Sequence, residues 1–299
     1  MYDALYMKHG SRMKGIAYRM LGSVSDAEDA VHDVFAKLAA GEPVEMQYPG
    51  AYLAKLTVNR CLNILKSARR RRESYIGAWL PEPIIESAEQ GPEARLDSDG
   101  DVSYAWLVML ERLTPAERAV FVLRESFGYG YDELASMLGK TEANCRKLQS
   151  RAAAKLKDAP QQTAQPEPEH VFVWMKAFLK AARDGDFTEV IARLSEDAVL
   201  VSDGGGKVRA AINPIYGRER VAAFFEGLSA KGAYRGEWAE VFVNGQRGLM
   251  YRKDDFIRVI TVVGDEDGRI SSVYMIMNPD KLVHVNLLRG VTNGEPTLS

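Results

Sequence analysis

The sequence is poor in the residues that build disulfide frameworks and metal centres. Two cysteines, Cys61 and Cys145, and four histidines occur among the 299 residues. The cysteines lie far apart within helical patterns, so we expect small buried hydrophobic groups rather than a disulfide. His170 and His284 form no recognisable metal or catalytic set with the nearby carboxylates. We therefore expect no cofactor and no metal.

Long apolar runs and a strong net charge are also missing. No segment approaches the roughly 18 apolar residues of a membrane span. Polar residues at Tyr2-Asp3 and Lys8-His9 interrupt any signal peptide. These features predict a cytoplasmic protein. The net charge is −2, so the chain taken as a whole does not indicate nucleic-acid binding.

The charge is nevertheless distributed unevenly. Residues 1–80 hold 12 Lys and Arg against 8 Asp and Glu, whereas residues 81–100 hold one Arg against 6 acids. A basic first segment followed by an acidic spacer indicates local roles that the total charge conceals. The spacer also carries Pro81, Pro83 and Pro92, and it has little apolar material to bury, so we expect a linker.

Hydrophobic periodicity predicts three helices in residues 1–76. The first covers residues 3–21. Ser25 opens the second through a capping box with Glu28. The third begins after Pro49-Gly50 and ends in four arginines, Arg69, Arg70, Arg71 and Arg72.

The surfaces of these helices carry two kinds of charge. The third helix interleaves basic, amide and aromatic groups, which suit phosphates and unpaired bases. These are Asn59, Arg60, Asn63, Lys66, the arginine run and Tyr75. A solvated basic helix end is the alternative. The second helix carries Asp26, Asp29 and Asp33, which indicate either a solvated face or a protein partner.

Residues 101–157 are helical again and contain a helix-turn-helix pattern. Thr114 is the expected N-cap before Pro115. Helix 131–138, a turn at Gly139 and a second helix capped by Thr141 follow. Outward polar groups on the second helix suit base edges and phosphates of the major groove. They are Thr141, Glu142, Asn144, Arg146, Lys147, Ser150 and Arg151. A short solvated helical hairpin is the alternative.

After residue 170 the pattern changes to mixed helices and strands. We expect helices at 171–182, 187–194 and 218–230, and strands at 198–202, 239–243, 248–252, 256–263 and 270–277. Asn244-Gly245 and Asp267-Gly268 are typical of hairpin turns. Helices followed by a curled antiparallel sheet predict an α+β domain.

The order of these segments resembles the extracytoplasmic-function (ECF) class of bacterial RNA polymerase sigma factors. The resemblance rests on the acidic DAEDAVHDVF helix, the basic helix, the linker and LTPAERAVFVLRE with its helix-turn-helix. Three further motifs, WLPEP at 79–83, DGGGK at 203–207 and NPDKL at 278–282, resemble the subgroup with a SnoaL-like C-terminal extension.

The resemblance implies a multidomain chain with two all-α sigma domains and an α+β SnoaL-like cone similar to nuclear-transport-factor folds. Sigma domain 2 would cover 1–78, the acidic linker 79–100, sigma domain 4 101–158, a second linker 159–168, and the SnoaL-like regulatory domain 169–299.

It also implies roles for the charged helices. The chain would bind core RNA polymerase and direct transcription initiation at promoters. Asn59, Arg60, Asn63, Lys66 and the arginine run would engage the minus-ten element, and the helix from Thr141 to Arg151 would read the minus-thirty-five element. Asp26, Asp29 and Asp33 would face the polymerase clamp helices. Asn63 stands where the family more often has Asp.

We expect the three short motifs to meet at one rim of the cone and to form an interdomain regulatory site. Trp79 offers a large apolar anchor, and Lys207 or Lys281 would pair with Glu82. The residues are Trp79, Leu80, Pro81, Glu82, Pro83, Asp203, Gly204, Gly205, Gly206, Lys207, Asn278, Pro279, Asp280, Lys281 and Leu282.

Other functions remain open for the C-terminal segment. Its cone would enclose a pocket for an unknown small molecule, and some relatives of SnoaL are isomerases or cyclases that use an acid–base pair. The alternative function is thus a DNA-binding regulator with a ligand-binding or catalytic domain. Because no catalytic constellation is recognisable, we assign no catalytic residue and expect a non-enzymatic protein.

Overall fold

The computed structural model describes residues 2–41, 46–73, 75–87, 102–157 and 169–288. It divides into two compact units. The helical unit comprises residues 1–74 and 96–162, and the sheet unit comprises residues 75–95 and 163–299. The segment with WLPEP therefore belongs to the sheet unit, whereas the sequence predicted a linker.

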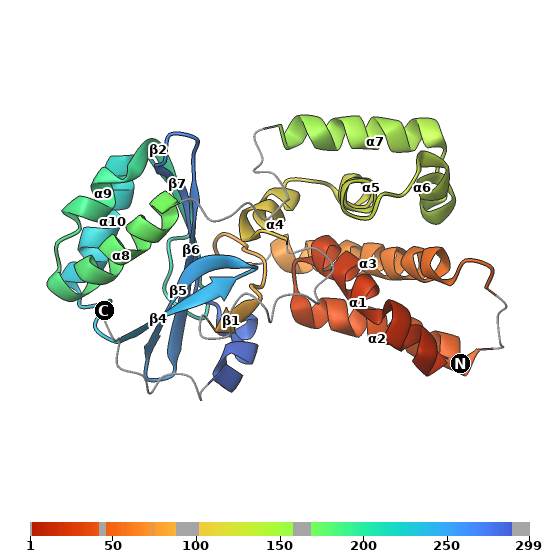
Figure 1. Ribbon diagram of the computed structural model, residues 1–299, viewed down its shortest axis with the longest axis horizontal. Helices are drawn as coiled ribbons and strands as arrows, with labels where there is room; N and C mark the ends of the chain where they lie inside the picture. The colour runs from red at the N-terminus through yellow and green to blue at the C-terminus, as the bar shows by residue number, and fades with distance from the viewer. Residues whose placement is uncertain (1, 42–45, 74, 88–101, 158–168, 289–299) are drawn as a thin grey trace. The chain divides into compact units, whose positions relative to one another are not determined.

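The helical unit contains seven helices among its described residues (Figure 1). They are α1 (Tyr2–Leu21), α2 (Val24–Ala40), α3 (Pro49–Glu73), α4 (Tyr104–Leu110), α5 (Pro115–Phe127), α6 (Tyr131–Leu138) and α7 (Glu142–Lys155). The first three form the expected bundle, and α6 and α7 form the expected helix-turn-helix.

One buried core joins the two halves of the helical unit. Ile16 and Val58 from the first half and Val120 and Leu134 from the second half belong to the same apolar cluster. Arg118 of α5 is also buried, and its Nη1 donates hydrogen bonds to the Met20 carbonyl at 2.9 Å and to Glu111 at 2.9 Å. A buried guanidinium needs such acceptors, so the two helical segments pack together in a defined way.

The helix-turn-helix signals are confirmed. Thr114 caps α5 in a capping box with Glu117, and Pro115 is the first helical residue. Thr141 caps α7 by accepting a hydrogen bond from the Asn144 amide. Gly139 ends α6 in the left-handed conformation, with φ of 62°. A residue with a side chain would be strained at this φ.

The predicted capping box at Ser25 is wrong. Ser23 is the N-cap of α2, and its Oγ accepts a hydrogen bond from the Asp26 amide at 3.1 Å. Ser25 lies inside the first turn, where its Oγ is 3.1 Å from Ser23 Oγ. The first of two closely spaced serines has the extended backbone that an N-cap needs.

The sheet unit consists of helices α8 (Glu169–Asp184), α9 (Thr188–Ala192) and α10 (Arg218–Ala230) on one face of a curved sheet (Figure 1). The strands are β1 (Ile85–Ser87), β2 (Leu194–Asp203), β3 (Ile215–Tyr216), β4 (Glu237–Val243), β5 (Gln246–Lys253), β6 (Phe256–Gly264) and β7 (Ile270–Ile276). Two short 3₁₀ helices follow, η2 (Pro279–Lys281) and η3 (Val283–Leu288).

The strand order is β1-β4-β5-β6-β7-β2-β3. The sequence predicted an antiparallel sheet, but β2 and β7 pair in parallel. This pairing places the ends of both strands, at Asp203 and Ile276, on the same side of the sheet. The predicted helix at 187–194 is also shorter than expected, because β2 already begins at Leu194.

Aromatic side chains fill the space between the helices and the sheet. Phe178 of α8 lies at the centre of this cluster, with ring centroids of Phe187, Phe225, Tyr234 and Trp238 at 5.4–5.6 Å. Phe178 and Phe225 are fully buried. Large rings that interlock in this way supply apolar burial, and so this part of the cone is a packed core.

Candidate functional site

A segment that precedes the cone in sequence is docked on its sheet. We call residues 75–87 the docked segment. Its C-terminal part forms β1, which adds to the sheet edge by pairing Ile85 with Val243 and Ser87 with Val241 of β4. Ile84 extends this contact, because its carbonyl accepts a hydrogen bond from the Asn244 amide at 2.8 Å. The sequence analysis missed this strand, although the apolar pair Ile84-Ile85 was a possible signal for it.

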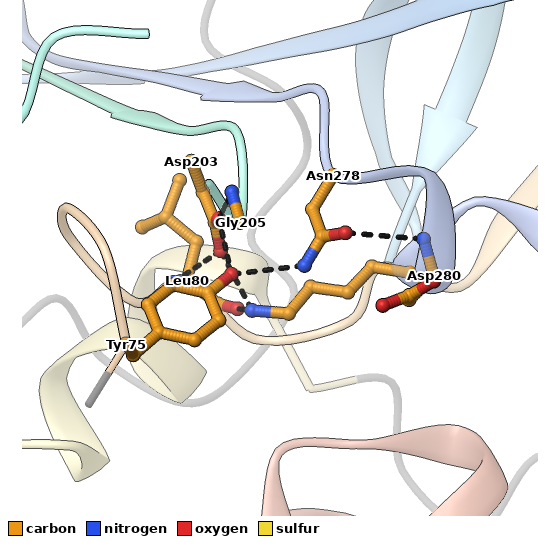
Figure 2. A network of polar contacts seen from close by, with 7 residues as sticks. Tyr75, Leu80, Asp203, Gly205, Asn278 and Asp280 are labelled. Atoms are coloured by element: carbon orange, nitrogen blue, oxygen red, sulfur yellow. Dashed lines mark hydrogen bonds and ion pairs between the residues drawn. The ribbon is translucent and has the colours of Figure 1, made fainter. Parts of the chain in front are cut away.

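The first half of the docked segment meets DGGGK and NPDKL at a buried carboxylate (Figure 2). Asp203 is 0% exposed and ends β2. Four donors surround its two oxygens. They are Tyr75 Oη at 2.5 Å, the Leu80 amide at 2.9 Å, the Gly205 amide at 3.0 Å and Lys281 Nζ at 2.6 Å. A carboxylate has about four lone-pair sites, so Asp203 is fully hydrogen-bonded.

Lys281 neutralises this carboxylate from η2. The two side chains form an ion pair whose exposed fractions are 6% for Lys281 and 0% for Asp203. The ammonium group also donates a hydrogen bond to the Leu80 carbonyl, and it lies 3.3 Å from the ring centroid of Trp79. Lys281 therefore contacts both the backbone and an aromatic side chain of the docked segment. We expected a lysine to pair with Glu82, but Glu82 lies 3.6 Å from His284 Nδ1.

Tyr75 connects the two motif loops through its hydroxyl group. The hydroxyl donates to Asp203 and accepts a hydrogen bond from Asn278 Nδ2 at 2.9 Å. Asn278 Oδ1 in turn accepts from the Asp280 amide at 3.1 Å and caps η2. Burial, followed by the bond to Asp203, raises the pKa of Tyr75 well above its usual range. The hydroxyl thus stays protonated at neutral pH and donates to Asp203.

Sequence reasoning placed Tyr75 among base-stacking groups and left it out of the regulatory site. Its ring packs edge-on against Trp79, with centroids 5.0 Å apart. The one sequence feature that could have indicated this contact is the position of Tyr75 four residues before Trp79. We define the Asp203 cluster as Tyr75, Trp79, Leu80, Asp203, Gly205, Asn278 and Lys281.

The glycines of DGGGK allow the close approach of the three segments. Gly205 has φ of 61°, and a Cβ there would overlap the Asn278 side chain. Gly206 has φ of 72°, and a Cβ there would lie 3.0 Å from Ile76. Both positions therefore favour glycine for backbone conformation and for space. Lys207 closes the motif with an exposed ion pair to Asp280 at 2.6 Å.

The remaining motif residues lie around the cluster. Pro81, Glu82, Pro83, Gly204 and Leu282 are buried, whereas Pro279 is exposed. The docked segment thus has far more buried surface than the solvated linker that its composition predicted. The physical reason is that β4 and the loops after β2 and β7 cover it.

The candidate DNA-binding residues of α3 are distributed over a partly covered surface. Asn63 and Lys66 are exposed, whereas Asn59 and Arg60 are half-buried. The Asn59 amide donates to the Met137 carbonyl of α6, and Arg60 forms an ion pair with Asp33 at 2.5 Å. Asp33 is one of the three acids expected to face polymerase. Asp29 is exposed and Asp26 is half-buried.

The helix α7 presents the expected polar face. All seven candidate residues on it and at its cap are exposed: Thr141, Glu142, Asn144, Arg146, Lys147, Ser150 and Arg151. Arg146 forms an ion pair with Glu142 at 2.9 Å, and its guanidinium carbon lies 4.5 Å from the ring centroid of Tyr131. Arg69, Arg70, Arg71 and Arg72 belong to α3, but their side chains lie outside the described residues.

Neither a metal-binding cluster of side chains nor a membrane-spanning helix is found among the described residues. Within residues 2–41, 46–73, 75–87, 102–157 and 169–288, no group of three or more His, Cys, Asp and Glu is placed to hold a metal ion. No helix in the same ranges is long and apolar enough to cross a membrane. Cys61 and Cys145 are free and buried, as the sequence predicted.

The helical bundle and the capped helix-turn-helix correspond to two regions of the sigma-70 proteins. Residues 5–71 match the model of Sigma-70 region 2, and residues 104–156 match that of Sigma-70, region 4. The chain is 32% identical over 281 residues to the ECF RNA polymerase sigma factor SigJ of Mycobacterium tuberculosis, covering 90% of this chain and 89% of SigJ. It is 35% identical over 191 residues to the probable ECF sigma factor SigI of that species, covering 63% of this chain and 65% of SigI.

The chain belongs to the ECF family of RNA polymerase sigma factors. The crystal structure of M. tuberculosis SigJ is similar, with a TM-score of 0.74 and 29% identity over 93% of this chain and 97% of SigJ. The predicted family and the fold of two helical sigma regions with a C-terminal α+β region are confirmed. The sigma regions act in transcription, not as an enzyme.

Proposed function

We propose that this sigma factor recruits core RNA polymerase to a small set of promoters and that its own cone controls this step. Helix α3 engages the minus-ten element, α7 reads the minus-thirty-five element, and the acids of α2 face polymerase. The observation that carries the regulatory part is the Asp203 cluster, in which a buried ion pair holds the docked segment.

The docked segment has a position in the chain that suits control. It begins two residues after the end of α3 and is followed by residues 88–101, which lead to α4. An extended chain spans at most about 3.5 Å per residue. When residues 75–87 are released, they therefore add their own extended length to the connection between the two promoter-binding regions.

Greater reach matters because the two promoter elements lie many base pairs apart. In the structure, α3 and α6 contact one another and the helical unit has one shared core. Binding to two separated elements requires these regions to move apart. We therefore propose that the docked state restrains the sigma factor and that release of residues 75–87 favours initiation.

Run-off transcription with purified core polymerase tests the function directly. We expect the full chain to start specific transcripts, on a promoter from its own gene neighbourhood, that core polymerase alone does not start. Binding to that DNA without specific initiation would instead favour a DNA-binding regulator.

The exposed face of α7 predicts a change in promoter selectivity. Asn144→Ala or Arg146→Ala removes a side chain that reaches bases, and removing a bidentate interaction with a base costs about 1–3 kcal/mol. We expect weaker binding and relaxed preference at the minus-thirty-five element, measured by competition between wild-type and mutated promoters. Lys157→Ala, an exposed change just beyond α7, is the matched control. Unaltered selectivity in both variants contradicts the assignment.

The arginine run predicts a loss of affinity without a loss of sequence preference. Replacing Arg69, Arg70, Arg71 and Arg72 with alanine should lower the salt dependence of promoter binding, with the slope falling by about 0.9 for each phosphate that an arginine no longer neutralises. Fluorescence anisotropy at several salt concentrations measures this slope. A wild-type slope in the quadruple variant shows that the run is only a solvated helix end.

A further inference from the structure

A cavity of about 260 Å³ lies beside the Asp203 cluster, within the sheet unit. The two motif loops supply part of its wall. Val208 follows Lys207 of DGGGK, and Met277 directly precedes Asn278 of NPDKL. Pro279 and Leu282 lie at the start and end of η2. Its volume is just below the roughly 300 Å³ at which small-molecule sites commonly begin.

The other wall is the hairpin between β5 and β6. It contributes Phe256 and Ile257, which are apolar, and the carboxylate-bearing Asp255. Asp255 is exposed, and the neighbouring Asp254 occupies the left-handed turn position with φ of 52°. The cavity thus has an apolar lining with negative charge at its edge, and the described residues of its wall include no cation.

The two lysines of the motif loops are paired with other carboxylates. Lys207 is paired with Asp280 at 2.6 Å, and Lys281 with Asp203 at 2.6 Å. The hairpin also carries Lys253, which lies opposite Phe256, together with the two carboxylates of Asp254 and Asp255. We propose that the cavity binds a small organic cation, an ammonium group on an apolar body, whose binding stabilises the docked segment. This inference rests on the proposed regulatory function. The apolar body would contact Ile257, Met277 and Leu282, and the ammonium group would face Asp255.

The coupling follows from the shared elements. Lys281 lies between Pro279 and Leu282 in sequence, and it contacts the Leu80 carbonyl. The Met277 amide donates to the Asp203 carbonyl at 2.8 Å. A ligand that fills the cavity holds η2 in the position from which Lys281 reaches the docked segment. A ligand shifts an equilibrium by its difference in affinity for the two states, so the docked state gains stability.

The test uses the full chain and three probes of similar shape. They are 2-phenylethylammonium, neutral 2-phenylethanol and anionic 3-phenylpropionate. We expect the ammonium probe to bind at least about fivefold more tightly than the other two, a difference that one favourable charge contact at an exposed site can supply. Calorimetry gives the affinities, and hydrogen exchange at the Leu80 amide reports docking.

Variants of the wall separate the contributions. Asp255→Asn should abolish the preference for the ammonium probe, whereas Asp267→Asn, an exposed change in another hairpin, should retain it. Val208→Phe should fill the cavity and prevent binding. Equal or tighter binding of the neutral or anionic probe, no binding of any probe, or binding that survives Val208→Phe overturns the site.

Binding without slower exchange at Leu80 overturns the coupling. These measurements contain no polymerase or DNA. A failure of the ligand site therefore leaves the transcription result intact, and a failure of transcription control leaves the binding result intact.

Discussion

Replacing Asp203 with alanine is expected to release the docked segment. The change removes the acceptor for Tyr75, Leu80 and Lys281 at once. It also leaves the Lys281 ammonium buried beside Trp79 without its carboxylate. Breaking a buried ion pair by removing one partner costs about 3–5 kcal/mol. Docking should therefore lose most of its stability.

Hydrogen exchange measures this release without any assay of transcription. The Leu80 amide donates to Asp203 and the Ile84 amide donates to Asn244 Oδ1, so both should exchange much faster in Asp203→Ala. Amides in the centre of β6 provide the internal standard, because they report whether the sheet itself remains folded.

Two further variants make the result specific. Tyr75→Phe removes one of the four hydrogen-bond donors to Asp203, and it should accelerate exchange at the Leu80 amide to a smaller extent than Asp203→Ala. Asp280→Asn breaks the exposed pair with Lys207, and such pairs contribute only about 0–1 kcal/mol. If Asp203→Ala and Asp280→Asn have equal effects on Leu80, the buried carboxylate does not hold the segment.

Locking the docked segment is expected to suppress promoter-specific transcription. Glu86 of β1 lies directly opposite Phe242 of β4. Opposed residues in antiparallel strands have Cα atoms about 4.5–5.5 Å apart, within the range that a disulfide spans. Glu86→Cys with Phe242→Cys should therefore form a crosslink under oxidising conditions. Cys61 and Cys145 are fully buried and can remain.

Run-off transcription by this variant should fall under oxidising conditions and recover after reduction. The physical reason is that the crosslink prevents residues 75–87 from adding to the reach between the promoter-binding regions. A cysteine pair at Glu237 and Arg252, which oppose one another in β4 and β5, is the matched control because it does not involve the docked segment. Full activity with an intact Glu86–Phe242 crosslink would refute control by release.

Local signals in the sequence predicted helix ends and turns correctly where a residue type strongly prefers one backbone conformation. Thr114 with Pro115, and Thr141, identified two helix starts, and Gly139 identified the turn between α6 and α7. Asn244 and Gly245 have the positive φ values that their hairpin requires. The capping box at Ser25 failed because two serines lie within reach of the same helix start, and local sequence does not choose between them.

The composition of residues 79–100 was a weaker guide. Prolines and acids predicted a solvated linker, yet Leu80, Pro81, Pro83 and Ile85 are buried. Burial depends on surface supplied from elsewhere in the chain, here by β4 and by the loops after β2 and β7. For the same reason Tyr75 resembled a nucleic-acid contact in sequence, while in the structure its hydroxyl bonds Asp203 and Asn278.

The helices, the turns, the family and the three motifs were predictable from the sequence, because these depend on neighbouring residues and on their order. The parallel pairing of β2 with β7 and the ion pair between Lys281 and Asp203 became visible only in the folded chain. The addition of β1 to the sheet edge likewise became visible only there. These features join residues more than 70 positions apart, and such pairings are selected by packing and by hydrogen-bond satisfaction in the folded chain.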